Sequence, residues 1–135
     1  MKRSAVLVCP GRGSYGPGDL GAITAKASKD GQDMIQRLDD RRRSLGQITL
    51  SDLDKKNRFS LKTHTNSENA SSLIFASSLL DFLSIDNNEY EIVAVTGNSL
   101  GWYTAITCAS AVPLMEGFNI VNTMGTLMES KGRGG

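Results

Sequence analysis

The chain has 135 residues, of which 39% are hydrophobic and 21% are charged, and its formal net charge is +1 at pH 7. This length suits one domain, and the balanced charge gives no electrostatic reason to expect a nucleic-acid partner. No apolar run is long enough to span a bilayer, and residues 5–8 are too short for a signal peptide. We therefore expect a cytoplasmic protein with no membrane partner.

The only two cysteines, Cys9 and Cys108, each lie in an apolar segment. Such cysteines are typical of small core residues in a reducing compartment, although a disulfide between them remains open. No cluster of His, Cys and Asp has the spacing of metal ligands. We therefore expect no metal, and acyl transfer of the kind discussed below needs no bound redox cofactor.

The N-terminal segment predicts a parallel strand followed by a glycine-rich loop. The strand is expected at Ala5 to Cys9 and the loop at Pro10 to Gly18. Loops at the carboxyl ends of strands are where α/β folds build their sites. From Leu20 to Leu45 the pattern predicts a helix that stops near Gly46. Its basic triplet, Arg41 to Arg43, is predicted to be a solvated helix face.

The middle of the chain is polar and carries the single histidine. Ser51 to Lys62 is lysine-rich, and Thr63 to Glu68 reads as a loop in which His64 is expected to have a surface role. Apolar residues then predict a helix from Ala70 to Leu83. The later elements are expected as a strand at Glu91 to Thr96 and two helices at Leu100 to Ala111 and Leu114 to Met128.

Between that strand and the next helix lies a G-x-S-x-G pentapeptide, Gly97-Asn98-Ser99-Leu100-Gly101. This pattern is typical of a nucleophile elbow, where the serine lies on a strained turn and both glycines avoid steric clashes. Ser99 would lie at the N-terminus of the following helix, whose N–H groups can stabilise an oxyanion. Because such glycines also mark ordinary strand-to-helix turns, the pentapeptide alone leaves catalysis open.

Two separated segments, VLVCPGRGS and VTGNSLGWYTAITCASAVPLMEGFNIVNTMGTLM, together resemble the malonyl-CoA:acyl carrier protein transacylase (ACP S-malonyltransferase) family. Members usually show an F-P-G-Q-G-S loop, a G-H-S-L-G-E-Y elbow and a downstream R-G-x-L-M segment. Here Pro10 to Ser14, Gly97 to Tyr103 and Met124 to Met128 occupy those places in order. The resemblance implies an α/β fold with a three-layer, parallel-sheet, α/β-hydrolase-like core, and an acyltransferase of fatty acid or polyketide synthesis.

The resemblance also implies roles for individual residues. Ser99 would take an acyl group from coenzyme A as an ester and pass it to the thiol of acyl carrier protein. The backbone N–H groups of Arg12 and Leu100 would form the oxyanion hole. Asn98 and Met124 would contact the substrate, in place of the family's histidine and of the arginine that pairs with the malonyl carboxylate. Acyl-CoA would be a substrate, not a cofactor, and the acyl specificity stays open.

The family's catalytic histidine and ferredoxin-like small domain would follow the last residues of this sequence. The resemblance therefore implies that residues 1–135 are the N-terminal part of an acyltransferase domain, without its catalytic C-terminal half. Three functions remain open at this point. They are acyl transfer, hydrolysis by an α/β serine hydrolase with the same elbow, and a non-catalytic module that binds acyl carrier protein or pairs with a separate C-terminal half.

Overall fold

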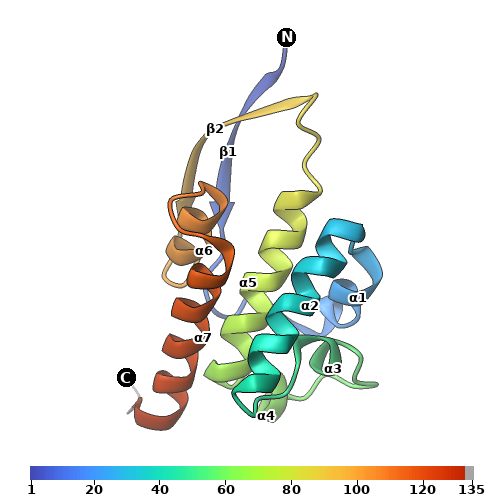
Figure 1. Cartoon of the computed structure of the whole chain (residues 1–135), viewed down its shortest axis with the longest axis vertical. Helices are drawn as coiled ribbons and strands as arrows, with labels where there is room; N and C mark the ends of the chain where they lie inside the picture. The colour runs from blue at the N-terminus through green and yellow to red at the C-terminus, as the bar shows by residue number, and fades with distance from the viewer. Residues whose placement is uncertain (133–135) are drawn as a thin grey trace.

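The structure is a computed structural model that describes residues 1–132, and Figure 1 shows its arrangement. Two parallel strands form a small sheet, with helices gathered along one side of it. The elements follow in the order β1 (Arg3–Cys9), η1 (Pro17–Asp19), α1 (Ala22–Lys26), α2 (Lys29–Ser44), α3 (Leu50–Asp54), α4 (Leu61–His64), α5 (Ser67–Leu83), β2 (Tyr90–Gly97), α6 (Gly101–Cys108) and α7 (Leu114–Lys131).

The two strands predicted from the sequence are confirmed, and they pair in parallel. The register places Arg3 opposite Tyr90 and Cys9 opposite Gly97. It slips by one residue in the middle, where Val93 has no opposite residue. Parallel strands need a long crossover connection, and helices α1 to α5 provide it. The carboxyl ends of β1 and β2 therefore lie side by side, and the loops that follow them meet there.

The helices form a layer against one face of the sheet. Helix α6 contacts both strands, and α5 packs between α7 on one side and α2 on the other (Figure 1). Because α5 lies in the centre of this layer, most of its residues are buried, from Asn69 to Ala76 without a break. A helix surrounded by neighbours has this all-round burial. The predicted helices over Ala70–Leu83, Leu100–Ala111 and Leu114–Met128 are confirmed as α5, α6 and α7.

The segment from Leu20 to Leu45 is not a single helix. It holds α1 and α2, separated by a break in which Ser28 accepts a hydrogen bond from the Gly31 N–H. Serine is a favoured N-cap because its hydroxyl satisfies one of the free N–H groups of the first turn. The expected stop is confirmed, since α2 ends at Ser44 and Gly46 follows with a φ of 69°.

Two short helices, α3 and α4, lie in the polar middle segment, and α4 and the start of α5 extend into the loop expected from Thr63 to Glu68. Thr49 caps α3 by accepting from the Asp52 N–H, and Ser60 caps α4 by accepting from the Thr63 N–H. Helices of four or five residues are too short to show the 3.6-residue apolar repeat. Only their capping residues signal them in the sequence.

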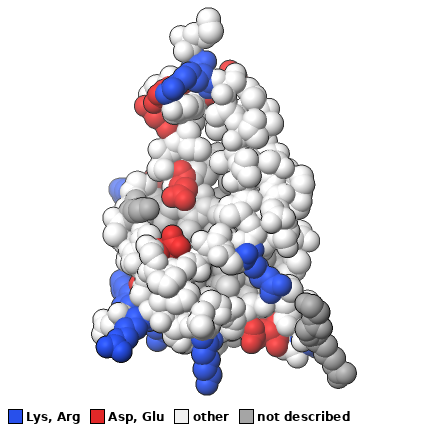
Figure 2. Space-filling view, turned by 180° about the vertical axis from the view of Figure 1, so that it is seen from behind, with Lys and Arg blue, Asp and Glu red and all other residues white. Residues whose placement is uncertain are grey.

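The opposite face of the sheet is left uncovered by the described residues. Val6 is 56% exposed, Val8 69% and Val93 57%. Figure 2 shows a face of the molecule that consists mostly of uncharged residues. Parallel sheets are normally covered on both faces, so these valines form a bare apolar surface.

Candidate nucleophile elbow

Ser99 lies in the sharp turn between β2 and α6, with its side chain exposed. Its φ of 54° is in the left-handed region, which residues other than glycine rarely adopt. The turn closes through hydrogen bonds from the Gly101 N–H to the Asn98 carbonyl, at 2.9 Å, and from the Trp102 N–H to the Ser99 carbonyl, at 3.1 Å. Such strained positions cluster at functional sites.

The two glycines of the pentapeptide are required by close backbone contacts. A Cβ atom on Gly97 would collide with the backbone of Gly101, and a Cβ on Gly101 would collide with the Cys9 carbonyl. Because backbone atoms cannot move aside as a flexible side chain can, no other residue fits either position without a shift of the main chain. This is the steric requirement that the sequence pattern predicts for an elbow.

The loop after β1 packs against this turn. The Asn98 N–H donates to the Cys9 carbonyl at 3.1 Å. A Cβ atom placed on Gly11 would lie 2.7 Å from the Asn98 carbonyl oxygen and 3.5 Å from the Ser99 Cβ. Residue 12 is therefore next to the serine. Within residues 1–132, the backbone N–H groups of Arg12 and Leu100 donate to no backbone acceptor.

The Arg12 side chain extends from this loop to the start of α5. Its guanidinium donates to the Ser67 hydroxyl at 2.8 Å. The Ser67 carbonyl lies against α7, 2.5 Å from where a Cβ of Gly125 would be, and the half-buried Met124 precedes that glycine. The Ser67 N–H in turn donates to the Glu129 carboxylate of α7 at 2.7 Å, so a cation and an anion both lie at the start of α5.

His64 is fully buried, so the expected surface role is wrong. Its Nδ1 accepts from the Ser60 N–H at 3.0 Å, and its Nε2 lies 3.0 Å from the Leu53 carbonyl. This pattern fits a neutral ring protonated at Nε2, and the ring also stacks on Phe59 with a centroid distance of 4.9 Å. Both nitrogens are used within the fold, so the only histidine of the sequence cannot serve Ser99 as a base.

Arg42 is also fully buried, which corrects the expectation of a solvated basic triplet. Its flanking residues, Arg41 and Arg43, are exposed as expected. Burial lowers the pKa of the Arg42 guanidinium to about 10, although the carboxylates of Glu68 and Asp39 partly oppose this shift. The guanidinium donates to five oxygens, which belong to the carbonyls of Ile48 and Glu68 and to the side chains of Asn69, Ser72 and Asn122.

A buried carboxylate that the sequence analysis missed holds the loop after β1 in place. Asp54 accepts from the Tyr15 hydroxyl at 2.9 Å, from the Gly21 N–H at 3.0 Å and from the Thr24 N–H at 2.9 Å. Burial and Asp54 together raise the pKa of the Tyr15 phenol. Tyr15 thus anchors the far end of the segment that carries Arg12, and nothing in the local sequence pattern signals this long-range contact.

Cys9 and Cys108 are both free thiols in the core, so the disulfide alternative is not what the structure has. Burial raises the pKa of both thiols, that of Cys108 to about 12. Among residues 1–132, no three His, Cys, Asp or Glu side chains lie close enough to hold a metal ion. In the same part of the chain, no helix combines the length and the apolar character needed to cross a membrane.

The parallel strands, the glycine-flanked serine turn and the helix after it are the arrangement of a nucleophile elbow in an α/β fold. No protein-family model and no curated protein matches this chain. Solved structures match it well. One match is the malonyl-transacylase of a type II polyketide synthase, solved in complex with its acyl carrier protein. The alignment includes 92% of this chain and 38% of that protein, at 22% identity and a TM-score of 0.74.

Two further matches come from named bacteria. One is an acyl carrier protein S-malonyltransferase from Vibrio cholerae, with 21% identity and a TM-score of 0.74. The alignment includes 93% of this chain and 39% of that protein. For FabD from Acinetobacter baumannii, the identity is 24%, the TM-score is 0.72, and 93% of this chain covers 37%. The likeness predicted from the sequence is therefore confirmed at the level of the fold, and the chain spans about two fifths of each of these proteins.

Proposed function

We propose that this chain carries the nucleophile of an acyltransferase of the malonyl-CoA:acyl carrier protein type. The observation that carries the proposal is the geometry of Ser99, strained at a φ of 54° beside the free N–H groups of Arg12 and Leu100. The similar solved proteins are malonyl-transacylases, and one is bound to its acyl carrier protein. This supports acyl-CoA and acyl carrier protein as the partners of this chain too.

In the first step, the Ser99 hydroxyl attacks the carbonyl carbon of the thioester and loses its proton to a base. The negative charge that forms on the carbonyl oxygen is stabilised by the N–H groups of Arg12 and Leu100 and by the N-terminus of α6. The carbon–sulfur bond then breaks, and coenzyme A leaves as a thiol while the acyl group stays on Ser99 as an ester. The thiol of acyl carrier protein attacks this ester in the second step, and the Ser99 hydroxyl is regenerated.

The proposal requires a base that residues 1–132 do not offer, because His64 is enclosed in the core. We place that base on a polypeptide region that covers the bare face and the open edges of the sheet. More than half of each similar protein has no counterpart in this chain, which supports such a region. In this proposal residues 1–135 correspond to the N-terminal part of the domain. The cytoplasmic location remains a prediction from the sequence.

The choice of acyl group depends on which cation, if any, replaces the arginine expected at Met124. The Arg12 guanidinium, which follows the loop residue Gly11 beside Ser99, donates to the Ser67 hydroxyl, and the Glu129 carboxylate of α7 accepts from the Ser67 N–H. An acyl group with a free carboxylate could pair with this guanidinium, since guanidinium–carboxylate contacts are strong and directional. An uncharged acyl group would gain nothing from Arg12.

The test supplies the protein with holo acyl carrier protein and either malonyl-CoA or acetyl-CoA, with imidazole added as a replacement base. Acyl carrier protein and free coenzyme A are then measured by mass spectrometry. We expect acylated carrier protein from the unchanged chain and none from Ser99→Ala. Arg12→Ala removes the guanidinium but keeps the backbone N–H of residue 12. It should therefore slow the transfer of a malonyl group, which has a free carboxylate, more than the transfer of an uncharged acetyl group. Release of free acid would instead indicate a hydrolase, and carrier-protein binding without transfer would indicate a non-catalytic module.

A further inference from the structure

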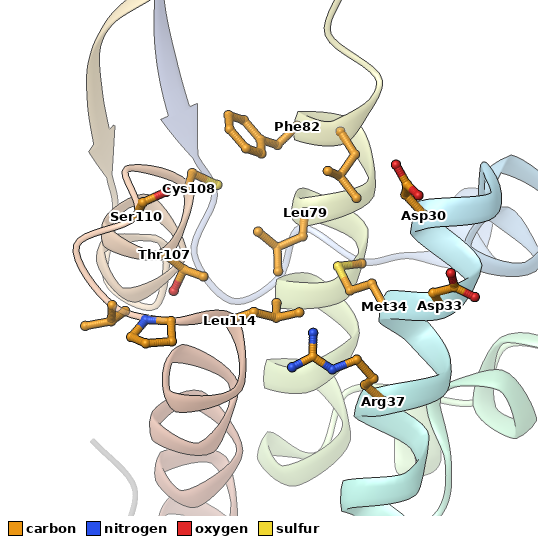
Figure 3. A pocket seen from close by; sticks show the side chains of 13 residues that line it. Asp30, Asp33, Met34, Arg37, Leu79, Phe82, Thr107, Cys108, Ser110 and Leu114 are labelled. Carbon is orange, nitrogen blue, oxygen red and sulfur yellow. The ribbon is translucent and has the colours of Figure 1, made fainter.

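A pocket of about 470 Å³ lies between α2, α5 and the loop that joins α6 to α7, away from the elbow (Figure 3). Its walls include Met34 from α2, Leu79 and Phe82 from α5, and Leu114 at the start of α7. These side chains point toward one another across the opening in Figure 3. The volume lies within the range typical of small-molecule sites, roughly 300–1,000 Å³, which are mostly apolar with a few placed polar groups.

One cation is directed into this pocket. Figure 3 shows the Arg37 guanidinium extending from α2 toward Leu114. Arg37 is an exposed residue of α2, and among the described side chains it makes neither an ion pair nor a hydrogen bond. Its charge is therefore available to a ligand at the end of the pocket lined by Leu114.

Two carboxylates on α2 also belong to the rim. Asp33 points away from Leu79 and Leu114 in Figure 3, while Asp30 is directed toward the end of the pocket where Phe82 lies. Asp30 is in the first turn of α2, where free backbone N–H groups offset its charge. Arg37 and Asp30 thus lie on different parts of the rim, and a carboxylate ligand would be expected to pair with Arg37 and to lie away from Asp30.

We propose that this pocket binds a small apolar carboxylate of the fatty-acid type. The carboxylate pairs with Arg37, and the alkyl chain lies against Met34, Leu79 and Phe82. A guanidinium beside an apolar wall can recognise an anion with an apolar tail, because the carboxylate pairs with the cation while the alkyl chain buries apolar surface. The site is distinct from Ser99, so the proposal does not depend on the acyltransferase function.

The test titrates the isotope-labelled protein with octanoate and follows the NMR signals of Met34, Leu79 and Leu114. 1-Octanol and octylammonium serve as neutral and cationic probes with the same alkyl chain. Arg37→Gln removes the cation, and Lys29→Gln is the matched control, since Lys29 is an exposed cation on α2 outside the pocket. Leu114→Trp, which would fill the opening, is the second variant.

We expect octanoate to shift these signals in a saturable manner, and octanol and octylammonium to bind more weakly. Arg37→Gln should weaken octanoate binding about tenfold, as expected for the loss of one charge-assisted contact. Lys29→Gln should leave binding unchanged, and Leu114→Trp should abolish it in a protein whose other signals are preserved. The proposal is overturned if octanoate shifts none of these signals, if octylammonium binds more tightly, or if Arg37→Gln binds octanoate as the unchanged protein does.

Discussion

At the scale of single residues, Arg42 connects three helices through one side chain. Arg42 is a residue of α2. Its guanidinium donates to the side chains of Asn69 and Ser72 on α5 and of Asn122 on α7. A buried guanidinium costs desolvation free energy, which these contacts offset. Asn122 and Ser72 also bond to each other, at 2.8 Å, so the whole network is satisfied only when the arginine is present.

We therefore expect Arg42→Ala to lower the free energy of unfolding by about 3 kcal/mol or more, because it leaves several buried polar groups without partners. Urea denaturation measures this change. Arg43→Ala is the matched control: Arg43 is an exposed neighbour whose ion pair with Asp40 should contribute under about 1 kcal/mol. Equal effects of the two substitutions would contradict the buried network.

Cys108 gives a second prediction at this scale. Burial raises the pKa of its thiol from 9.0 to about 12, so at pH 8 much less of it is present as thiolate than in the unfolded chain. Alkylation by iodoacetamide should accordingly be slow in the folded protein and fast in urea. The pKa of Cys108 is higher in the folded protein than in the unfolded chain. The contribution of the protonated thiol to the free energy of unfolding is therefore complete below pH 9 and is lost as the pH rises toward 12. Rapid alkylation of the native protein would contradict it.

At the scale of elements, the elbow depends on two backbones that approach without side chains between them. Helix α6 begins against the end of β1, and Gly101 is the residue at this contact. Gly97 has the same role between β2 and the first turn of α6.

Gly101→Ala should therefore lower the free energy of unfolding by about 2 kcal/mol or more, since its methyl group would meet the backbone of Cys9 and Pro10. Gly18→Ala is the control, because a Cβ there has open space and needs no unusual φ. Thermal unfolding followed by circular dichroism compares the two. A Gly101→Ala protein as stable as Gly18→Ala would mean that the elbow is looser than described.

Which elements could be predicted follows from how each one is stabilised. The strands and α5 to α7 have apolar patterns long enough to read, and the glycines of the elbow follow from local sterics. Helices α3 and α4 depend on caps and on tertiary contacts, as does the burial of His64 at the end of α4. Arg42 could have been found, because it lies four residues after Leu38 and seven after Ile35 and so shares their buried face.

At the scale of the whole molecule, the helices lie on one face of the sheet and leave the other bare. The candidate site is likewise described only in part, and its features divide into those that a local sequence pattern encodes and those that depend on long-range packing. Ser99, its flanking glycines and the neighbouring loop are local features of the sequence, and the structure brings them together. The base and the acyl-group contacts depend on long-range packing, which no local pattern encodes, and the described residues do not contain a base for Ser99.

Because one face of the sheet is uncovered, substitutions at neighbouring residues of β1 should differ in their effect on the free energy of unfolding. Val8→Lys should change the free energy of unfolding by less than about 0.5 kcal/mol, because Val8 is exposed. Leu7→Lys should lower it by about 2 kcal/mol or more, because Leu7 packs against the core. Urea denaturation again gives both values. A large loss on Val8→Lys would show that this face is covered in the protein alone.

The central claim is that Ser99 is an acyl acceptor, and intact-protein mass spectrometry after exposure to malonyl-CoA or acetyl-CoA tests it most directly. Imidazole is added in place of the absent base, and Ser99→Ala controls for acylation elsewhere. We expect a single acyl adduct that increases with imidazole, maps to Ser99 and is missing from the Ser99→Ala variant. No adduct on the folded protein with either thioester, or the same adduct on Ser99→Ala, would contradict it.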